Sequence, residues 1–211
     1  MTAASIARLR IKLDDVEPAV ERRVEVPLTI RLDRLHLVLQ AAMGWTNSDL
    51  YEIRARDVGW GRPDPHFGDG PLDASKARLI DVLEDVGTRS LKYLYDFGDG
   101  WEHSIRIERI TDAVPGMAYP CLIDAAERCP PEDVSGPWGY RDFLDAIADP
   151  NLQEHAERIE WIGSNFDPNS TDVEALTQAK VGPTAPYFSR KIRAIGHARR
   201  DERSAPAWRN L

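Results

Sequence analysis

The strongest constraint on the fold is an alternation of apolar and polar residues on both sides of a glycine-rich turn. Leu91, Tyr93 and Tyr95 occupy alternate positions, and after Gly98-Asp99-Gly100 apolar and polar residues alternate from Trp101 to Glu108. A period of two places one side of a strand against a core, and Gly-Asp-Gly is typical of a hairpin turn. The sequence therefore predicts a β-hairpin with His103 on its inward face.

Three further strands and four helices are predicted from the same kind of pattern. Helical spacing of apolar residues, with glycines at 44 and 87 as left-handed terminators and Thr29 as an N-cap, indicates the first two helices. The expected strands are 8–13, 23–26 and 53–55, and the expected helices are 28–43, 77–86, 140–148 and 152–162. Segments 59–71 and 115–137 are expected to be irregular because they are rich in Gly and Pro. The fold class is α+β: a mixed or antiparallel sheet packed against helices, with a helical C-terminal part.

Composition and cysteine content favour a cytoplasmic protein that is not inserted in a membrane. The 211 residues are 42% hydrophobic and 29% charged and contain two cysteines. No apolar run approaches the roughly 20 residues of a membrane span, and two cysteines cannot form a disulfide framework.

Charge is distributed unevenly along the chain, whose formal net charge is −8. Residues 183–211 contain seven Lys or Arg and two acidic residues, which leaves 20 basic and 33 acidic side chains, a net of −13, in the first 182 residues. We predict a domain over residues 1–175 and a basic, partly disordered extension over 176–211. The extension could attract nucleic acid or the acidic surface of the domain itself, whereas the acidic domain should repel phosphate backbones.

Several familiar catalytic motifs are absent. The sequence contains no phosphate-binding Gly-rich loop, no dinucleotide fingerprint, no His-Glu-x-x-His and no Gly-x-Ser-x-Gly. Asp96-Phe97-Gly98 matches a kinase tripeptide, but the other kinase motifs are missing. Nucleotide hydrolysis, dinucleotide redox chemistry, zincin proteolysis and serine esterase activity therefore have no support.

Polar residues around the predicted hairpin form the candidate ligand site. Its members are Asp96, Asp99, Trp101, His103, Glu132 and Asp133. The two turn aspartates could instead serve the turn by accepting backbone hydrogen bonds, His103 could be a core histidine, and Trp101 could be a core anchor. The other five residues, Asp96, Asp99, His103, Glu132 and Asp133, could instead hold a divalent cation and support metal-dependent hydrolysis.

A second candidate site is a structural metal centre. Two thiolates and two imidazoles, Cys121, Cys129, His103 and His155, would suit zinc or another divalent metal. His155 is placed by helical spacing on the core-facing stripe of its helix. The seven residues between the cysteines exceed the usual knuckle spacing, so a reversible disulfide and two buried thiols remain alternatives.

Several separated motifs resemble one family. The run from Tyr93 to His103, then Cys129-Pro130-Pro131-Glu132-Asp133 and Gly139-Tyr140, is similar to the plasmid pRiA4b ORF-3-like family, whose members are also described as insertion-element passenger proteins. The resemblance covers roughly residues 5–170. It implies a compact α+β domain carried by a plasmid or transposon, and it implies no established biochemical activity.

The preferred functional interpretation is a non-catalytic binding or interaction module. Its pocket would lie between the 96–103 hairpin and the 121–133 loop and would take a protein or a small ligand. A metal-dependent hydrolase or nuclease-like enzyme that uses Asp96, Asp99, His103, Glu132 and Asp133 is the first alternative. Nucleic-acid binding through the basic extension is the second.

Overall fold

The computed structural model describes residues 5–63, 70–163, 166–171 and 173–178. A single eight-stranded sheet in the order β5-β4-β3-β6-β7-β1-β2-β8 organises them. All neighbouring strands are antiparallel except β4 and β5. The strands are β1 (Ser5–Leu13), β2 (Glu21–Pro27), β3 (Tyr51–Ala55), β4 (Val58–Gly61), β5 (Leu72–Asp73), β6 (Ser90–Tyr95), β7 (Trp101–Asp112) and β8 (Cys121–Ala126).

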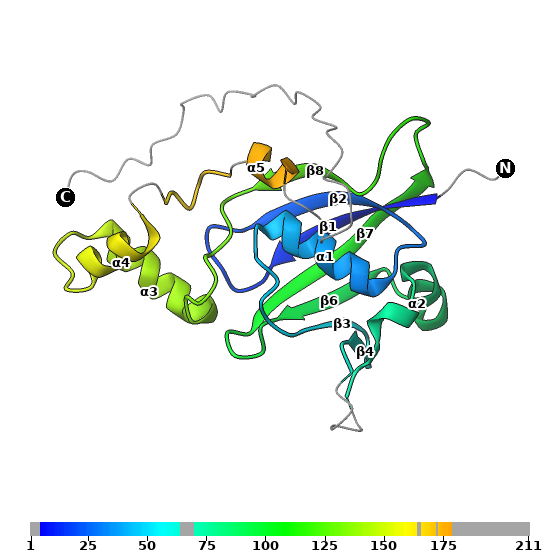
Figure 1. The fold of residues 1–211 in the computed structure, drawn as a ribbon, viewed down its shortest axis with the longest axis horizontal. Helices are drawn as coiled ribbons and strands as arrows, with labels where there is room; N and C mark the ends of the chain where they lie inside the picture. The colour runs from blue at the N-terminus through cyan, green and yellow to red at the C-terminus, as the bar shows by residue number, and fades with distance from the viewer. Residues whose placement is uncertain (1–4, 64–69, 164–165, 172, 179–211) are drawn as a thin grey trace, which may run out of the picture.

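The core lies on one face of this sheet, beneath helix α1 (Leu32–Met43), which crosses the central strands in Figure 1. Leu9, Ile11 and Leu13 point toward the helix, whereas Arg8, Arg10 and Lys12 point to the other face. This alternation is the one expected from the sequence, and it confirms the α+β fold.

Both predicted glycine terminators are present, but the predicted N-cap is wrong. Gly44 and Gly87 end α1 and α2 (Leu79–Val86) with φ of 83° and 62°. Helix α1 begins at Leu32 and Thr29 lies before it, because the carbonyl of Ala77 accepts the Leu32 N–H instead. A tertiary contact therefore replaces the local cap.

Two segments expected to be irregular contain strands. Residues 58–61 form β4, which extends into the first of these segments, and residues 121–126 in the second form β8 at the opposite edge of the sheet. Strand β5, residues 72–73, follows directly after the first segment. These strands are short, so pairing with the neighbouring strands, and not the local sequence pattern, determines their conformation.

The C-terminal part is helical, as predicted. Helices α3 (Gly136–Ala148) and α4 (His155–Ile162) pack on each other at the left of Figure 1, beyond the end of the sheet. A short helix α5 (Val173–Gln178) lies beside β8 and α1 and crosses the predicted boundary at residue 175. The rest of the predicted basic extension, residues 179–211, lies outside the described residues.

The predicted buried stripe on α4 is wrong. The helix contains no buried residue, and His155 is half-buried. Its side chain is used locally, since Nδ1 lies 2.9 Å from the Ala146 carbonyl oxygen of α3. Among the described residues, no helix is long and apolar enough to cross a membrane.

Candidate functional site

The β6–β7 turn is held by one of its own carboxylates. Asp96 has φ of 54°, and its Oδ1 accepts hydrogen bonds from the backbone N–H groups of Gly98 (2.9 Å) and Asp99 (3.2 Å). Such bonds are the usual way in which a short carboxylate stabilises a turn. The geometry matches the turn role that the sequence left open for Asp96.

Asp99 packs against the start of α3. A Cβ on Gly136, whose φ is 72°, would lie 2.2 Å from the Asp99 carbonyl oxygen, so the two backbones touch. Burial raises the pKa of Asp99, hydrogen bonding from the Gly136 and Ser135 backbone N–H groups opposes this rise, and Asp96 and Asp133 add to it. Ser135 makes no side-chain cap, so the Asp99 carboxylate supplies the negative charge at this helix N-terminus.

Glu132 joins three segments that are far apart in sequence. Its Oε1 accepts a 2.7 Å hydrogen bond from the Tyr95 hydroxyl, and its Oε2 accepts bonds from the Thr46 hydroxyl (2.7 Å) and backbone N–H (2.9 Å). The Ser48 hydroxyl lies 3.3 Å from Oε1. Burial, and to a lesser extent Glu132, raise the pKa of Tyr95 to about 12, so the phenol stays protonated and donates. Asp133, the next residue, is exposed.

His103 lies in the core and not at the rim of a pocket. The ring is fully buried, with Nδ1 3.2 Å from the carbonyl oxygens of Tyr93 and Trp101 and no hydrogen-bond partner at Nε2. Burial lowers its pKa to about 4, so the imidazole is neutral at pH 7. Trp101 is also buried, beside Trp45. None of the four candidate carboxylates is hydrogen-bonded to the His103 ring.

A second buried histidine, which sequence reasoning missed, heads a hydrogen-bonded chain. His36 of α1 stacks on Tyr51 at 3.6 Å, with Nδ1 2.9 Å from the Tyr93 hydroxyl and Nε2 2.5 Å from Asn47 Oδ1. Burial lowers its pKa to about 4. Gln40 donates to the same hydroxyl at 2.8 Å, so Tyr93 donates to Nδ1 and the His36 Nε2–H donates to Asn47. The one available sequence signal was its apolar helical spacing, which also fits an ordinary core position.

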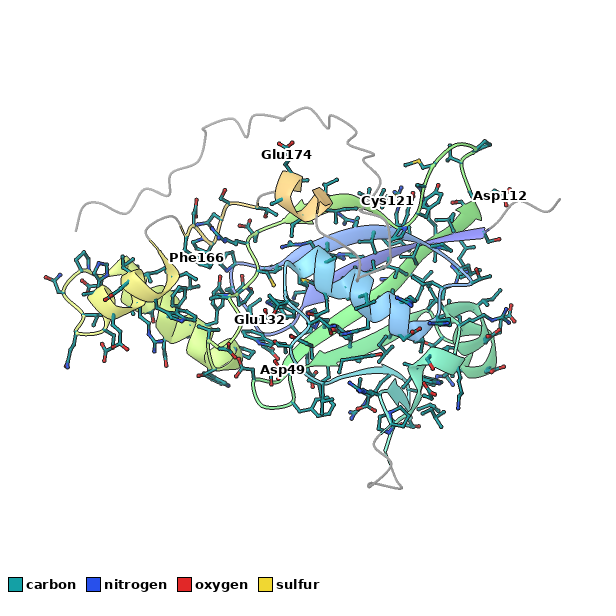
Figure 2. All side chains as sticks on the ribbon, viewed as in Figure 1. Asp49, Asp112, Cys121, Glu132, Phe166 and Glu174 are labelled. Carbon is teal, nitrogen blue, oxygen red and sulfur yellow. The ribbon has the colours of Figure 1, made fainter. Side chains whose placement is uncertain are left out.

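The predicted zinc set is not assembled. Cys121 pairs with Glu25 in the β2–β8 ladder, with its sulfur 3.8 Å from Glu25 Oε2, on the face of the sheet opposite to His103. Figure 2 shows Cys121 far from Glu132, and His155 lies beyond the sheet on α4. Cys129 is buried on the α1 side beside Arg22 and Tyr140, and burial raises its thiol pKa to about 12. Within the described ranges, no group of three or more His, Cys, Asp or Glu is placed to hold a metal ion.

An open hollow lies next to the predicted pocket. It is an open cleft of about 960 Å³ between the β1–β2 connection, the start of β7 and helix α3. Asp99 lines it, but Glu132 and Asp133 do not, because the chain turns into α3 immediately after them. Residues 137–145 of α3 therefore form the wall of this cleft, and not the predicted residues 121–133.

The cleft is acidic and has an exposed aromatic side chain at its rim. Trp138, the second residue after Gly136 in α3, is 78% exposed. Two cations, Lys12 and Arg141, line the cleft against five carboxylates: Asp15, Glu17, Asp99, Glu102 and Asp145.

Comparisons with known proteins give the family and the fold. A family model described as plasmid pRiA4b ORF-3-like protein matches residues 5–175. The uncharacterised protein y4hQ of Sinorhizobium fredii is 56% identical over 191 residues, which cover 90% of this chain and 97% of the relative. The crystal structure of MM3350, a protein of unknown function from Methanosarcina mazei Go1, matches with a TM-score of 0.73 at 28% identity and covers 82% of this chain and 98% of that chain.

Proposed function

The chain belongs to the plasmid pRiA4b ORF-3-like family, and from this premise we propose that it is a non-catalytic binding module whose acidic cleft recognises a positively charged protein segment. The family is plasmid-associated by its description, and carriage on a transposon stays a prediction. The observation that carries the proposal is the exposed indole of Trp138 at the rim of the acidic cleft.

The chemistry of the cleft favours a cationic ligand. Large exposed aromatic side chains are enriched at binding surfaces, and an indole attracts Lys or Arg through its π face. Five carboxylates against two cations give the cleft an excess of negative charge. Arg and Lys side chains of a partner would meet both features at once.

The geometry supports a preformed cleft. The close approach of Gly136 and Asp99, together with the hydrogen bonds that Glu132 accepts from Tyr95 and Thr46, fixes α3 against the β6–β7 hairpin. A preformed cleft lowers the ordering cost of binding, so a short basic segment can bind without reshaping the protein.

Fluorescence anisotropy with a labelled twelve-residue Lys/Arg/Gly/Ser peptide tests this function. We expect saturable binding to the full chain that weakens with salt, and much weaker binding of a matched Glu/Gly/Ser peptide that is insensitive to Trp138→Ala. Trp138→Ala and Glu17→Gln should each weaken binding several-fold. Phe97→Ala, which removes an exposed aromatic side chain outside the cleft, and Glu84→Gln on α2 should leave binding unchanged. Equal binding by Trp138→Ala and Phe97→Ala would overturn the proposal.

A further inference from the structure

The face of the sheet opposite to α1 places cations directly across from one another. Such like-charge neighbours destabilise a sheet. Four cross-strand pairs are of this kind: Arg54 with Lys92, Arg106 with Arg10, Arg10 with Arg23, and Arg8 with Arg109. They lie on β3, β6, β7, β1 and β2, a width of about 19 Å at about 4.8 Å per strand spacing. Between β6 and β7 the cations face serines instead, with Lys92 opposite Ser104 and Arg106 opposite Ser90. This cationic face is notable because the first 182 residues carry a net charge of −13.

Carboxylates neutralise many of these cations from neighbouring positions. The ion pairs are Arg54–Glu52 (2.6 Å), Lys92–Asp14 (2.8 Å), Lys92–Glu102 (4.0 Å), Arg8–Glu25 (2.6 Å), Arg109–Glu25 (3.6 Å), Arg23–Asp124 (2.8 Å), Arg23–Glu108 (3.3 Å) and Arg10–Glu21. Most involve side chains that are partly or largely exposed, and exposed ion pairs contribute at most about 1 kcal/mol. A stronger anion can therefore displace them at little cost.

Two arginines of this face have no carboxylate partner among the described residues. Arg106 makes no side-chain hydrogen bond or ion pair, and Arg56 donates a single 3.3 Å bond to the Gly87 carbonyl oxygen. Both line a groove of about 640 Å³ on this face, together with Lys92. The groove therefore contains two guanidinium groups that are free to bind an anion.

The hydroxyl groups beside these arginines indicate which anion fits. Thr88, Ser90 and Ser104 line the same groove. Ser104 donates to Asp14 (2.8 Å) and Thr88 donates to the Ser90 carbonyl oxygen (3.2 Å), so a phosphate would have to replace these two bonds, whereas the Ser90 hydroxyl can donate to it directly. Arginine, lysine and hydroxyl side chains together are the donors that contact phosphate oxygens in nucleic-acid complexes, and a guanidinium can bind phosphate through two parallel hydrogen bonds. A carboxylate-bearing peptide would use the guanidinium groups but would gain less from the hydroxyls.

The groove offers no surface on which bases could stack. Its one aromatic lining residue, Tyr93, is buried on the α1 side of the sheet. Stacking on exposed aromatic rings is the usual way to hold single-stranded bases. Recognition here would therefore concern the phosphate backbone and not the base sequence.

We propose that the cationic face binds the phosphodiester backbone of nucleic acid, with Arg56 and Arg106 as its anchors. Each strand of duplex DNA carries one phosphate per about 3.4 Å of helix axis, so a cationic face that extends about 19 Å along that axis spans about five of them. A polymer therefore fits the face better than a single nucleotide does. The screening length of about 8 Å at physiological salt limits the reach of acidic residues elsewhere on the molecule. This groove shares only Glu102 with the Trp138 cleft, and the proposal does not depend on the function of that cleft.

Binding of a fluorescein-labelled 20-base-pair DNA duplex to the full chain at low salt tests the proposal. We expect the Arg56→Gln/Arg106→Gln variant to bind on the order of tenfold more weakly, with the slope of log K against log salt reduced in magnitude by about 1.8, or 0.9 for each lost phosphate contact. The matched control, Arg34→Gln/Arg78→Gln, removes two cations next to α1 and α2 and should bind like the native chain. Urea midpoints of both variants check that the fold is intact.

Further experiments distinguish binding at this face from binding by the basic extension and from binding of other anions. A variant with Arg190, Lys191, Arg193, Arg199 and Arg200 changed to Gln should retain the arginine-dependent part of the binding. If that variant lost all DNA binding while Arg56→Gln/Arg106→Gln lost none, the DNA would bind to the extension and the proposal would be overturned. Equal competition by mononucleotide at the same phosphate concentration, or by poly-glutamate, would overturn it as well.

Discussion

The Tyr95 hydroxyl donates a 2.7 Å hydrogen bond to Glu132, and this bond joins the end of β6 to the proline-rich segment that leads into α3. Thr46 and Ser48 donate to the same carboxylate from the loop after α1. One side chain therefore fixes the relative positions of a strand, a loop and the approach to a helix.

Loss of this carboxylate should destabilise the fold. Glu132→Gln replaces an oxygen acceptor by an amide donor opposite Thr46 or Tyr95, and we expect the free energy of unfolding to fall by about 1–2 kcal/mol. Asp133→Asn, a matched change at the exposed neighbouring residue, should change it by less than about 0.5 kcal/mol. Urea unfolding measures both. A double-mutant cycle of Glu132→Gln with Tyr95→Phe should reveal a coupling energy. Strict additivity of the two changes in unfolding free energy would contradict the role of the Tyr95–Glu132 hydrogen bond.

The close approach of Gly136 to Asp99 predicts a sharp difference between two glycines. Gly136→Ala adds a Cβ at 2.2 Å from a backbone oxygen at a φ of 72°, so we expect a loss of about 3 kcal/mol or more. Gly116 has a similar φ of 77° but nothing within 4 Å of the added Cβ, so Gly116→Ala should cost about 1–2 kcal/mol, from backbone strain alone. Equal unfolding midpoints for the two variants would show that the turn and α3 do not touch.

Stability should fall in mild acid because of two buried histidines. His36 and His103 have folded-state pKa values lowered from 6.5 to about 4 by burial, so the unfolded chain binds more protons than the folded chain between these pH values. Their contribution is fully present above about pH 6.5 and is lost as the pH falls toward 4, by up to about 1.4 kcal/mol per pH unit for each group. Urea midpoints from pH 7 to 4.5 give the slope. His36→Gln should flatten it, whereas His155→Gln should not.

Arg22 should matter more than its neighbour Arg23. The Arg22 guanidinium is buried and donates to the carbonyl oxygens of Ala42 (2.8 Å), Glu21 (2.8 Å) and Ala126 (2.6 Å), so it joins α1 to β2 and β8. Arg22→Met should cost about 2–4 kcal/mol, because it leaves buried carbonyl groups without a donor. Arg23→Met removes only partly exposed ion pairs and should cost less than about 1 kcal/mol. Thermal unfolding compares the two, and a reversed order would contradict this role.

Elemental analysis of untagged protein purified without chelator tests the metal interpretations. Because Cys121 and His103 lie on opposite faces of the sheet, we expect no stoichiometric zinc. One equivalent of metal, lost in both His103→Ala and Cys121→Ser variants, would require a different arrangement of these residues.

The part of the fold that the sequence predicted is the part that local periodicity controls. The alternation around Gly98-Asp99-Gly100 placed His103 on the inward face, and the glycines at 44 and 87 marked two helix ends correctly. Strand β8 and the start of α1 were not predicted, because β2 supplies the partner of the first and Ala77 supplies the cap of the second.

The candidate site also has a part that the sequence predicted and a part that it did not. The sequence predicted a pocket between the 96–103 hairpin and the 121–133 loop. In the structure Asp99 packs against Gly136, and Glu132 accepts a hydrogen bond from Tyr95. The sequence could not show that Glu132 is bound by Thr46, 86 positions earlier, or that the open cleft continues along α3. Such contacts depend on how distant elements pack, and a single sequence contains no local pattern for them.

Glu102 lines both the Trp138 cleft and the groove of Arg56 and Arg106. This one carboxylate marks the border between two surfaces of opposite sign, and removing its charge should affect them in opposite directions. In Glu102→Gln, a basic peptide should bind more weakly while DNA binds more tightly, so a single substitution would report on both surfaces at once.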